Sequence, residues 1–265
     1  MITSTSNALI KFVRKLRDKK YRALSGLAFI EGTKLVMDAL DQGAGIEKLL
    51  ISESFIRSEK RLAVNSKIAD LALEKIIVAD EVFRNISTKE NPQGIAAVIQ
   101  QKWLPFDTFK KQFYGIWVGL WEIADPGNLG SIMRTVDAVS ARGVILLESC
   151  TDPYDPSAIR GSMGAVFSNN LVKSNSQEFI EWTKSSEIAV YGTSDAAKMY
   201  YREANYQNDL ILVMGSERQG LPDAILNICK QIVRIPMNGI SDSLNLAVAT
   251  GIVLYEILDQ RLKLD

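Results

Sequence analysis

Residues 114–260 alternate short apolar runs with amphipathic segments, and this alternation restricts the fold more than any other feature of the chain. The apolar runs have the length of buried strands, which we expect at Tyr114–Leu120, Gly143–Leu147, Ala189–Gly192, Leu210–Met214 and Ile232–Ile235. The intervening segments predict helices at Ser131–Val139, Gln177–Ser185, Pro222–Cys229 and Leu244–Gln260. This pattern is typical of an α/β domain whose parallel sheet is covered on both faces. Ligands bind such sheets beyond the carboxyl ends of the strands, so the loops at that edge are the candidates for a functional site.

The preceding residues predict a smaller α/β module. Apolar residues at helical spacing indicate a helix over residues 9–16, and a second helix is expected at Gly32–Leu40. Strands are expected at Leu27–Ile30, Lys48–Ser52, Lys75–Ala79 and Ile95–Gln100, with a charged stretch of helical character between the second and the third. Residues 106–112, which follow Pro105 and carry mixed charges, are predicted to be a linker. We therefore expect domains at residues 1–105 and 113–265.

The chain contains no histidine and only two cysteines, Cys150 and Cys229. Histidine is thereby excluded as a general base, a metal ligand or a triad member, and neither a disulfide framework nor a metal site is expected. This cysteine usage fits a reducing, cytoplasmic location. No apolar run approaches the roughly 18 residues that predict a membrane-spanning helix, so a membrane is not an expected partner.

Charge is distributed unevenly along the chain, although the total is zero. Residues 1–105 contain 17 Lys/Arg and 12 Asp/Glu, whereas residues 106–265 contain 14 and 19. A dense basic cluster lies near the N-terminus, and its candidate phosphate ligands are Lys11, Arg14, Lys15, Lys19 and Arg22. Such a cluster is typical of a phosphate-binding surface, but the solvated face of an ordinary helix explains it equally well.

Two loops that follow predicted strands are rich in glycine. The first reads Asp125-Pro126-Gly127-Asn128-Leu129-Gly130 and leads into the helix that carries Arg134. Glycine permits close approach of the backbone, a helix N-terminus offers N–H groups to an anion, and an arginine binds phosphate with two N–H groups. The second reads Gly215-Ser216-Glu217-Arg218-Gln219-Gly220. Glu217 either orients a neighbouring loop or a ligand, or simply pairs with Arg218 at the surface.

A third segment opens the last predicted helix and reads Ile235-Pro236-Met237-Asn238-Gly239, then Ser241-Asp242-Ser243-Leu244-Asn245. Asp242 or Ser243 is a good N-cap, and Asn245 would then lie in the first turn, where its amide can bond the backbone of another loop. An ordinary turn or helix cap explains each loop alone. Three such loops after strands of one predicted sheet favour a common site. The G-x-G-x-x-G and P-loop fingerprints are both missing from the sequence.

Taken together, these motifs resemble the SpoU/TrmH family of RNA ribose methyltransferases. The similar residues are Asn128, Gly130 and Arg134 in the first family motif, Gly215, Glu217 and Gly220 in the second, and Ile235-Pro236-Met237 with Ser243-Leu244-Asn245 in the third. The segment Arg160-Gly161-Ser162-Met163-Gly164-Ala165 is also similar, whereas Leu246-Ala247-Val248 stands where many members have Val-Ser-Val. Phe29-Ile30-Glu31-Gly32 and Pro92-Gln93-Gly94-Ile95 resemble the family's ribosomal-protein-like substrate-binding domain.

The resemblance implies a SPOUT fold, in which a C-terminal trefoil knot binds S-adenosyl-L-methionine, and an obligate homodimer formed through the knotted domain. By position, the implied cofactor contacts are Thr193, Gly215, Ile235 and Leu244. The implied catalytic set is Arg134, Asn128, Glu217, Asn245 and Ser243. RNA contacts are expected at Lys11, Arg14, Lys15, Lys19, Arg22 and Arg160.

The implied reaction is attack of a ribose 2′-oxygen on the sulfonium methyl group. A guanidinium holds its proton too strongly to be a good base. We therefore assign Arg134 to binding the RNA phosphate and stabilising the alkoxide that develops on the 2′-oxygen. Ribosomal RNA of the 23S type is the expected substrate, with transfer RNA as the alternative. An inactive RNA-binding protein of the same fold is a rival that intact Arg134, Glu217 and Asn245 argue against. A nucleotide- or nicotinamide-dependent α/β enzyme is a second rival, but its phosphate fingerprint is missing.

Overall fold

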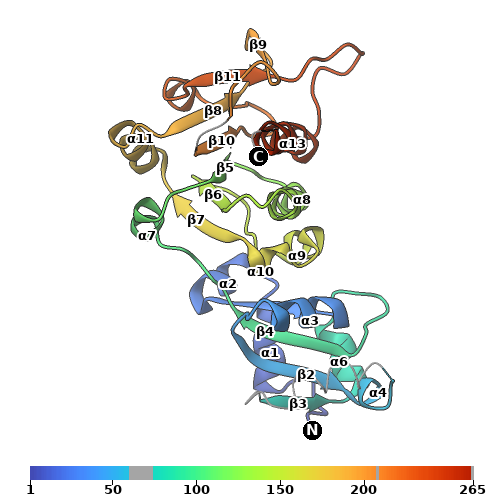
Figure 1. Ribbon diagram of the computed structural model, residues 1–265. Coiled ribbons are helices and arrows are strands. Elements are labelled where there is room, and N and C mark those ends of the chain that lie inside the picture. Colours follow the sequence, from blue (N-terminus) through green and yellow to red (C-terminus); the bar gives the residue numbers. More distant parts are fainter. Residues whose placement is uncertain (60–73, 207–208, 264–265) are drawn as a thin grey trace. The chain divides into compact units, whose positions relative to one another are not determined.

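A computed structural model of the chain describes residues 1–59, 74–206 and 209–263 (Figure 1). The chain divides into two compact units. The first comprises Met1–Lys102 together with Tyr154–Ile159, and the second comprises the remaining residues. No helix in the described part of the chain combines the length and the apolar character needed to cross a bilayer.

The first unit is a four-stranded mixed sheet with helices packed on it. Its strands are β1 (Leu27–Glu31), β2 (Ile46–Ser52), β3 (Lys75–Val78) and β4 (Ile95–Gln100), in the order β1-β4-β2-β3. β4 is antiparallel to both neighbours, and β2 and β3 are parallel. The helices are α1 (Ala8–Lys15), α2 (Lys19–Ser25), α3 (Thr33–Asp41), α4 (Glu53–Ile56) and α6 (Asp80–Ile86). One core cluster joins α1 and α6 to the sheet through Val13, Phe83 and Val98, as expected for helices that bury one apolar face.

The sequence predicts all four strands of this unit. The helices α2 and α6 were not predicted, because each has only 7 residues and two turns give little periodicity to recognise. The charged helical stretch expected between β2 and β3 lies mostly outside the described residues, at residues 60–73.

The second unit is built on a seven-stranded sheet in which every pair of neighbouring strands is parallel. Its strands are β5 (Ile116–Trp121), β6 (Gly143–Leu147), β7 (Asn170–Ser174), β8 (Ala189–Thr193), β9 (Met199–Tyr200), β10 (Leu210–Met214) and β11 (Gln231–Arg234). They stand in the order β7-β6-β5-β10-β8-β11-β9 (Figure 1). The helices are α7 (Phe106–Lys111), α8 (Pro126–Ala138), α10 (Ala165–Ser168), α11 (Ser176–Ser185), α12 (Asp223–Leu226) and α13 (Leu246–Leu262). A further helix, α9 (Pro156–Ser162), belongs to the first unit up to Ile159 and to the second from Arg160. The predicted parallel α/β architecture is confirmed.

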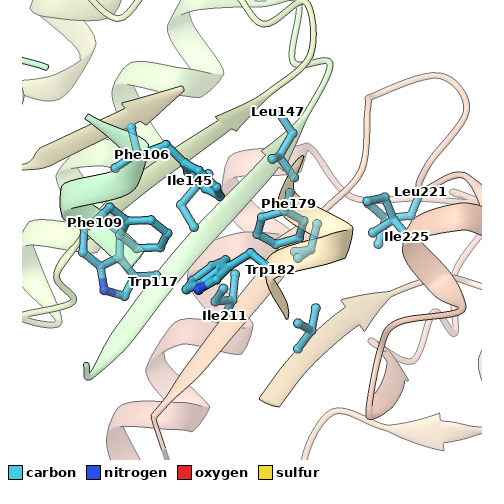
Figure 2. Close-up of a cluster of buried hydrophobic side chains, with 13 residues drawn as sticks. Phe106, Phe109, Trp117, Ile145, Leu147, Phe179, Trp182, Ile211, Leu221 and Ile225 are labelled. Atoms are coloured by element: carbon cyan, nitrogen blue, oxygen red, sulfur yellow. The ribbon is translucent and has the colours of Figure 1, made fainter. Parts of the chain in front are cut away.

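Residues 106–111, predicted as part of a linker, form the helix α7 instead. The aromatic residues in this segment explain the error, because Phe106 and Phe109 are core residues of the second unit. The rings of Phe109 and Trp117 lie 4.6 Å apart between centroids, and those of Phe109 and Trp182 lie 4.8 Å apart, both edge to face. Figure 2 shows this cluster between α7, α11 and the sheet. Burial of large aromatic side chains therefore makes α7 an integral part of the second unit.

Two strands of the large sheet were not predicted, and both lie at its edges. β7 buries only Leu171 and Val172 and carries polar residues around them, so it lacks a continuous apolar run. β9 has only two residues. An edge strand needs fewer apolar residues than a central one, which weakens its signal in the sequence.

Candidate functional site

Three loops meet at the carboxyl ends of the strands of the second unit. The neighbouring strands β5 and β10 lead into the loops before α8 and around Glu217, and the segment after β11 leads into α13. The carboxyl ends of parallel strands lie at the same edge of a sheet, so loops distant in sequence come together there. The three loops therefore converge at one edge of the sheet, where the common site was predicted.

A chain of side-chain hydrogen bonds ties the three loops together. The amide nitrogen of Asn128 donates to Glu217 Oε1 at 3.0 Å, and the amide nitrogen of Asn245 donates to Asn128 Oδ1 at 2.8 Å. The backbone N–H of Ala124 donates to Glu217 Oε2 at 3.4 Å. Asn128 is thus the central member of the chain. Its amide nitrogen donates to Glu217 of the second loop, and its Oδ1 accepts from Asn245 of the third. These hydrogen bonds hold the three loops against one another.

The two helix starts at this site differ from the prediction. α8 begins at Pro126 with Asp125 as its N-cap, whose carboxylate accepts from the N–H of Asn128 at 2.7 Å. α13 begins at Leu246, and Asn245 itself is the N-cap, accepting from Ala247 N at 2.9 Å. Toward the first loop, the amide nitrogen of Asn245 bonds the side chain of Asn128, whereas a backbone partner was predicted there. The carboxylate of Asp125 also places a negative charge at the N-terminus of α8, so this end of the helix is not the anion site that glycine and the helix start suggested.

The hydrogen bonds around Glu217 keep its carboxyl group ionised. Partial burial by itself raises the pKa of Glu217, but donors from the side chain of Asn128 and from the backbone of Glu217, Ala124 and Asp125 outweigh this effect. The net pKa lies below the ordinary value of 4.5. An ionised carboxylate only accepts hydrogen bonds, so Glu217 fixes the orientation of the Asn128 amide.

The Glu217→Gln variant should lose stability in a pH-dependent way. The folded-state pKa is depressed, so the carboxylate stabilises the fold above its unfolded pKa, and this contribution is lost as the pH falls through the folded-state value. We expect the free-energy difference between wild type and variant to be constant at about pH 6–8 and to shrink below about pH 4.5. Urea unfolding across this pH range measures it. The control is Glu181→Gln on the surface of α11, and an equal pH profile for both variants would contradict the role of Glu217.

A cavity of about 650 Å³ opens among the same loops. Its lining includes all four residues expected to contact a cofactor: Thr193, Gly215, Ile235 and Leu244. Glu217, Ser243 and Asn245 line it as well. Additional lining residues that were not predicted are Ser194, Asp195, Met214, Leu221, Val233, Arg234, Asp242 and Leu246. Most of these stand within a few residues of a strand end, and this position is the sequence signal that could have identified them.

Arg134 lies apart from this cavity lining. It is exposed on α8. Because α8 begins at Pro126 and not at the predicted Ser131, Arg134 occupies the ninth position of the helix and does not lie in its first turn. Within the described part of the chain it has no hydrogen-bond or ion-pair partner. An uncommitted, fully charged guanidinium at the surface is available to an anionic ligand from outside the chain.

One residue of the basic N-terminal cluster is misassigned by sequence reasoning. Arg22 is 1% exposed, and its guanidinium donates to the carbonyl oxygens of Leu16 and Arg17 at 2.9 and 2.8 Å. This buried side chain joins the end of α1 to α2, so the expected RNA contact at Arg22 is withdrawn. Among the other cluster candidates, Lys11, Lys15 and Lys19 are exposed and Arg14 is half-buried. Arg160 is exposed on α9.

Neither cysteine offers a reactive thiol. Burial raises the pKa of Cys150 to about 11 and that of Cys229 to about 12. Both thiols are therefore protonated near neutral pH, and a protonated thiol is a weak nucleophile and no base. The chemistry of the site must rest on carboxylates, amides, hydroxyls, guanidinium groups and a bound cofactor.

The fold and the site define an α/β protein with a small-molecule cavity at the strand ends and a separate N-terminal unit. Comparison with known families gives the assignment: residues 115–255 match the SpoU rRNA Methylase family, and residues 7–97 match the MRM3-like substrate binding domain. The chain belongs to the SpoU rRNA Methylase family. The resemblance drawn from the three motifs is thereby confirmed.

Several relatives and solved structures match over almost the full length. The 23S rRNA (guanosine(2553)-2′-O)-methyltransferase RlmP of Bacillus subtilis strain 168 is 28% identical over 97% of this chain and 98% of its own. The AdoMet-bound rRNA methyltransferase of Sinorhizobium meliloti has a TM-score of 0.87 and 35% identity, over 97% of this chain and 96% of its own. The SpoU methyltransferase AviRb of Streptomyces viridochromogenes, in complex with AdoMet, has a TM-score of 0.87 and 26% identity, over 97% and 98%.

Proposed function

We propose that the protein transfers a methyl group from S-adenosyl-L-methionine to a ribose 2′-hydroxyl of RNA, with ribosomal RNA of the 23S type as substrate. The observation that carries this proposal is the hydrogen-bonded chain of Glu217, Asn128 and Asn245 beside a cavity lined by all four expected cofactor residues. The names of similar proteins support it, because they include 23S ribosomal RNA 2′-O-methyltransferases and AdoMet-bound structures.

The residues that line the cavity fit S-adenosyl-L-methionine. A volume of about 650 Å³ lies within the range of roughly 300–1,000 Å³ typical of small-molecule pockets. Apolar side chains such as Ile235 and Leu221 offer flat contacts to an adenine ring, and the buried Gly215 exposes backbone groups at the strand end. Asp242 and Arg218 supply charges of both signs, as a ligand with ammonium, sulfonium and carboxylate groups requires.

The cofactor supplies an electrophilic methyl group, and the residues of this chain must align and activate the ribose hydroxyl. Rigid loops serve alignment, which alone can supply roughly 7–11 kcal/mol of barrier reduction in favourable cases. The hydrogen bonds of Asn128 fix the loops against one another. We assign Arg134 to binding the RNA phosphate and stabilising the negative charge that develops on the 2′-oxygen. Ser243 lies in the cavity lining, where its hydroxyl can orient the ribose.

We assign RNA capture to the N-terminal unit, in line with its match to a substrate-binding domain. Exposed Lys11, Lys15 and Lys19 provide positive charge there, and in the second unit we also assign the exposed Arg160 on α9 to a phosphate contact. Phosphate contacts of this kind give affinity and position but no sequence information. The cytoplasm is the proposed compartment, and a sequence with only two cysteines supports it.

A direct assay tests the reaction. The purified protein is incubated with methyl-labelled S-adenosyl-L-methionine and either unmodified 23S ribosomal RNA or unmodified transfer RNA, both transcribed in vitro. The RNA is then digested to nucleosides. Label in a 2′-O-methylnucleoside from ribosomal RNA is the expected result. Label in a base-methylated nucleoside, or in transfer RNA alone, would contradict the proposal.

The last helix, α13, supports a homodimer. Val248, Tyr255 and Leu262 are exposed by 51, 54 and 63% and stand seven residues apart, so they form an apolar stripe along one side of the helix. An apolar stripe open to water is typical of a surface that another chain covers. We propose that two copies pair isologously through this stripe. We also propose that the C-terminal residues form the trefoil knot of the family.

The Val248→Glu variant should dissociate this dimer. A carboxylate placed in an apolar interface loses its hydration without gaining a partner, which costs several kcal/mol. Light scattering after size exclusion should give the wild type twice the chain mass of 29.4 kDa and the variant a mass near 29.4 kDa. Lys184→Glu, on the surface of α11, is the matched control and should stay dimeric. A monomeric wild type would contradict the dimer.

A further inference from the structure

A tyrosine and an arginine form a stacked pair at the edge of the large sheet. Tyr200 on β9 stands opposite Arg234 on β11 in register. The guanidinium carbon of Arg234 lies 4.6 Å from the centroid of the Tyr200 ring, and its Nη2 donates to the Tyr200 hydroxyl at 3.2 Å. Tyr200 is nevertheless 40% exposed. Arg234 thus holds the aromatic ring in one orientation while much of the ring stays open to solvent.

This pair adjoins the cavity assigned to the cofactor. Arg234 lines the cavity together with Thr193 and Gly215, and it immediately precedes Ile235 of the third loop. The Nε atom of Arg234 is buried and has no hydrogen-bond partner in the described part of the chain. Among the strands that the structure describes, β9 is the last of the sheet and lies beside β11 (Figure 1). Tyr200 therefore stands in register with a residue that lines the cavity.

An RNA substrate brings groups that fit such a ring. The ribose 2′-hydroxyl that reacts must come close to the cavity, so the neighbouring nucleotides lie at its rim. Unpaired RNA bases are recognised by stacking on tyrosine and arginine planes, whichever base is present. The exposed Lys198, two residues before Tyr200, adds a positive charge suited to the phosphate backbone.

We infer that Tyr200, oriented by Arg234, stacks an unpaired base of the RNA next to the methylated nucleotide. The inference rests on the proposed RNA methyltransferase function. It assigns a substrate contact to the edge strand β9, outside the three family motifs. Stacking on one aromatic side chain changes affinity by on the order of 10-fold to 100-fold.

The chain contains a matched control for this pair. Tyr114 is exposed by 49%, and the guanidinium carbon of Arg142 lies 3.8 Å from the centroid of its ring. Tyr114 precedes β5 and Arg142 precedes β6, so this pair lies at the amino ends of the strands, opposite the cavity. The two pairs have the same chemistry and similar exposure, and they differ in their position relative to the site.

The experiment measures steady-state methylation of unmodified 23S ribosomal RNA transcript together with binding of S-adenosyl-L-methionine by calorimetry. Tyr200→Ala should raise KM for the RNA by about 10-fold to 100-fold, with kcat and cofactor affinity changed less than about 3-fold. Tyr200→Phe keeps the aromatic face and should retain most of the affinity. Tyr200→Leu keeps bulk without a π-face, so it should behave like alanine and replaces it if alanine prevents folding. Tyr114→Ala should match the wild type.

The outcomes separate the inference from the proposed function. If the wild type transfers no methyl group to RNA, the function fails and the inference with it. If the wild type is active and Tyr200→Ala and Tyr200→Leu keep its KM for RNA, the inference alone is wrong. A variant that loses cofactor affinity at an unchanged KM for RNA also overturns it, because the pair would then belong to the cofactor site. An equal rise in KM for Tyr114→Ala would show that the effect is not specific to the rim of the cavity.

Discussion

Replacing Arg134 with alanine is expected to reduce methyl transfer to RNA by on the order of 100-fold to 1,000-fold or more. The reason is electrostatic: the guanidinium is the group assigned to the RNA phosphate and to the charge that develops on the 2′-oxygen. Arg134 is exposed, lies outside the cavity lining and has no partner in the described part of the chain, so its removal should leave the fold and the cofactor site intact. Single-turnover methylation, cofactor calorimetry and light scattering measure the three properties separately.

The control for Arg134 is the exposed Arg142 before β6. Arg142→Ala removes the same charge elsewhere on the second unit, so it reports the effect of net charge on RNA binding together with the loss of stacking on Tyr114. Arg134→Lys asks whether a charge is enough, because lysine keeps the charge but loses the paired N–H geometry. Turnover retained in Arg134→Ala would refute the assigned role. Loss of cofactor binding in that variant would show that the residue acts on the fold instead.

Gly215→Ala is expected to weaken cofactor binding at least about 10-fold and to lower the stability of the protein. A Cβ atom at Gly215 would lie 2.2 Å from the carbonyl carbon of Gly220 and 2.5 Å from the nitrogen of Leu221. Both are backbone atoms, and the loop between them is closed by hydrogen bonds between Ser216 and Gly220 in both directions. The loop must therefore move as a whole, taking Glu217 and part of the cavity lining with it. Overpacking of this kind costs typically about 1–3 kcal/mol.

The control for this substitution is Gly239→Ala in the third loop, where a Cβ atom meets nothing within 4 Å. Calorimetry should show a dissociation constant raised at least about 10-fold for Gly215→Ala and unchanged for Gly239→Ala, and thermal unfolding should separate the variants in the same order. Cofactor binding at wild-type affinity by Gly215→Ala would mean that the ligand does not depend on the closed loop after β10.

The fold of the large domain was predictable because its central strands are buried on both faces. Leu210–Met214 and Gly143–Leu147 are apolar throughout and form strands with those bounds. The sequence was less informative at the edges, where β7 buries two residues and β9 is only two residues long. Segment 106–111 was predicted to be a linker because two phenylalanines among charged residues show no clear helical periodicity. In the structure both rings are buried in the core of the second unit.

The candidate site was predictable to the level of its loops but not of its contacts. The strand ends predicted the three loops of the site, and the family resemblance implied four residues of the cavity lining. No local pattern shows, however, that Asn128 bonds Glu217 and Asn245 at sequence separations of 89 and 117. Such pairings depend on which strands are neighbours. Arg22 is an error of the opposite kind. Its charge predicted an exposed RNA contact, but its guanidinium is buried and donates hydrogen bonds to two backbone carbonyl oxygens. Each error arises where tertiary contacts override the local pattern.

The most direct test of the central claim is a map of 2′-O-methylated nucleotides in total cellular RNA, with and without the gene for this protein. The map covers ribosomal and transfer RNA in one experiment and needs no prior choice of substrate. Our account predicts that one site in 23S-type ribosomal RNA loses its 2′-O-methyl group and regains it when the wild-type gene is restored, but not with the Arg134→Ala gene. An unchanged ribosomal RNA map, with loss confined to transfer RNA, would contradict it.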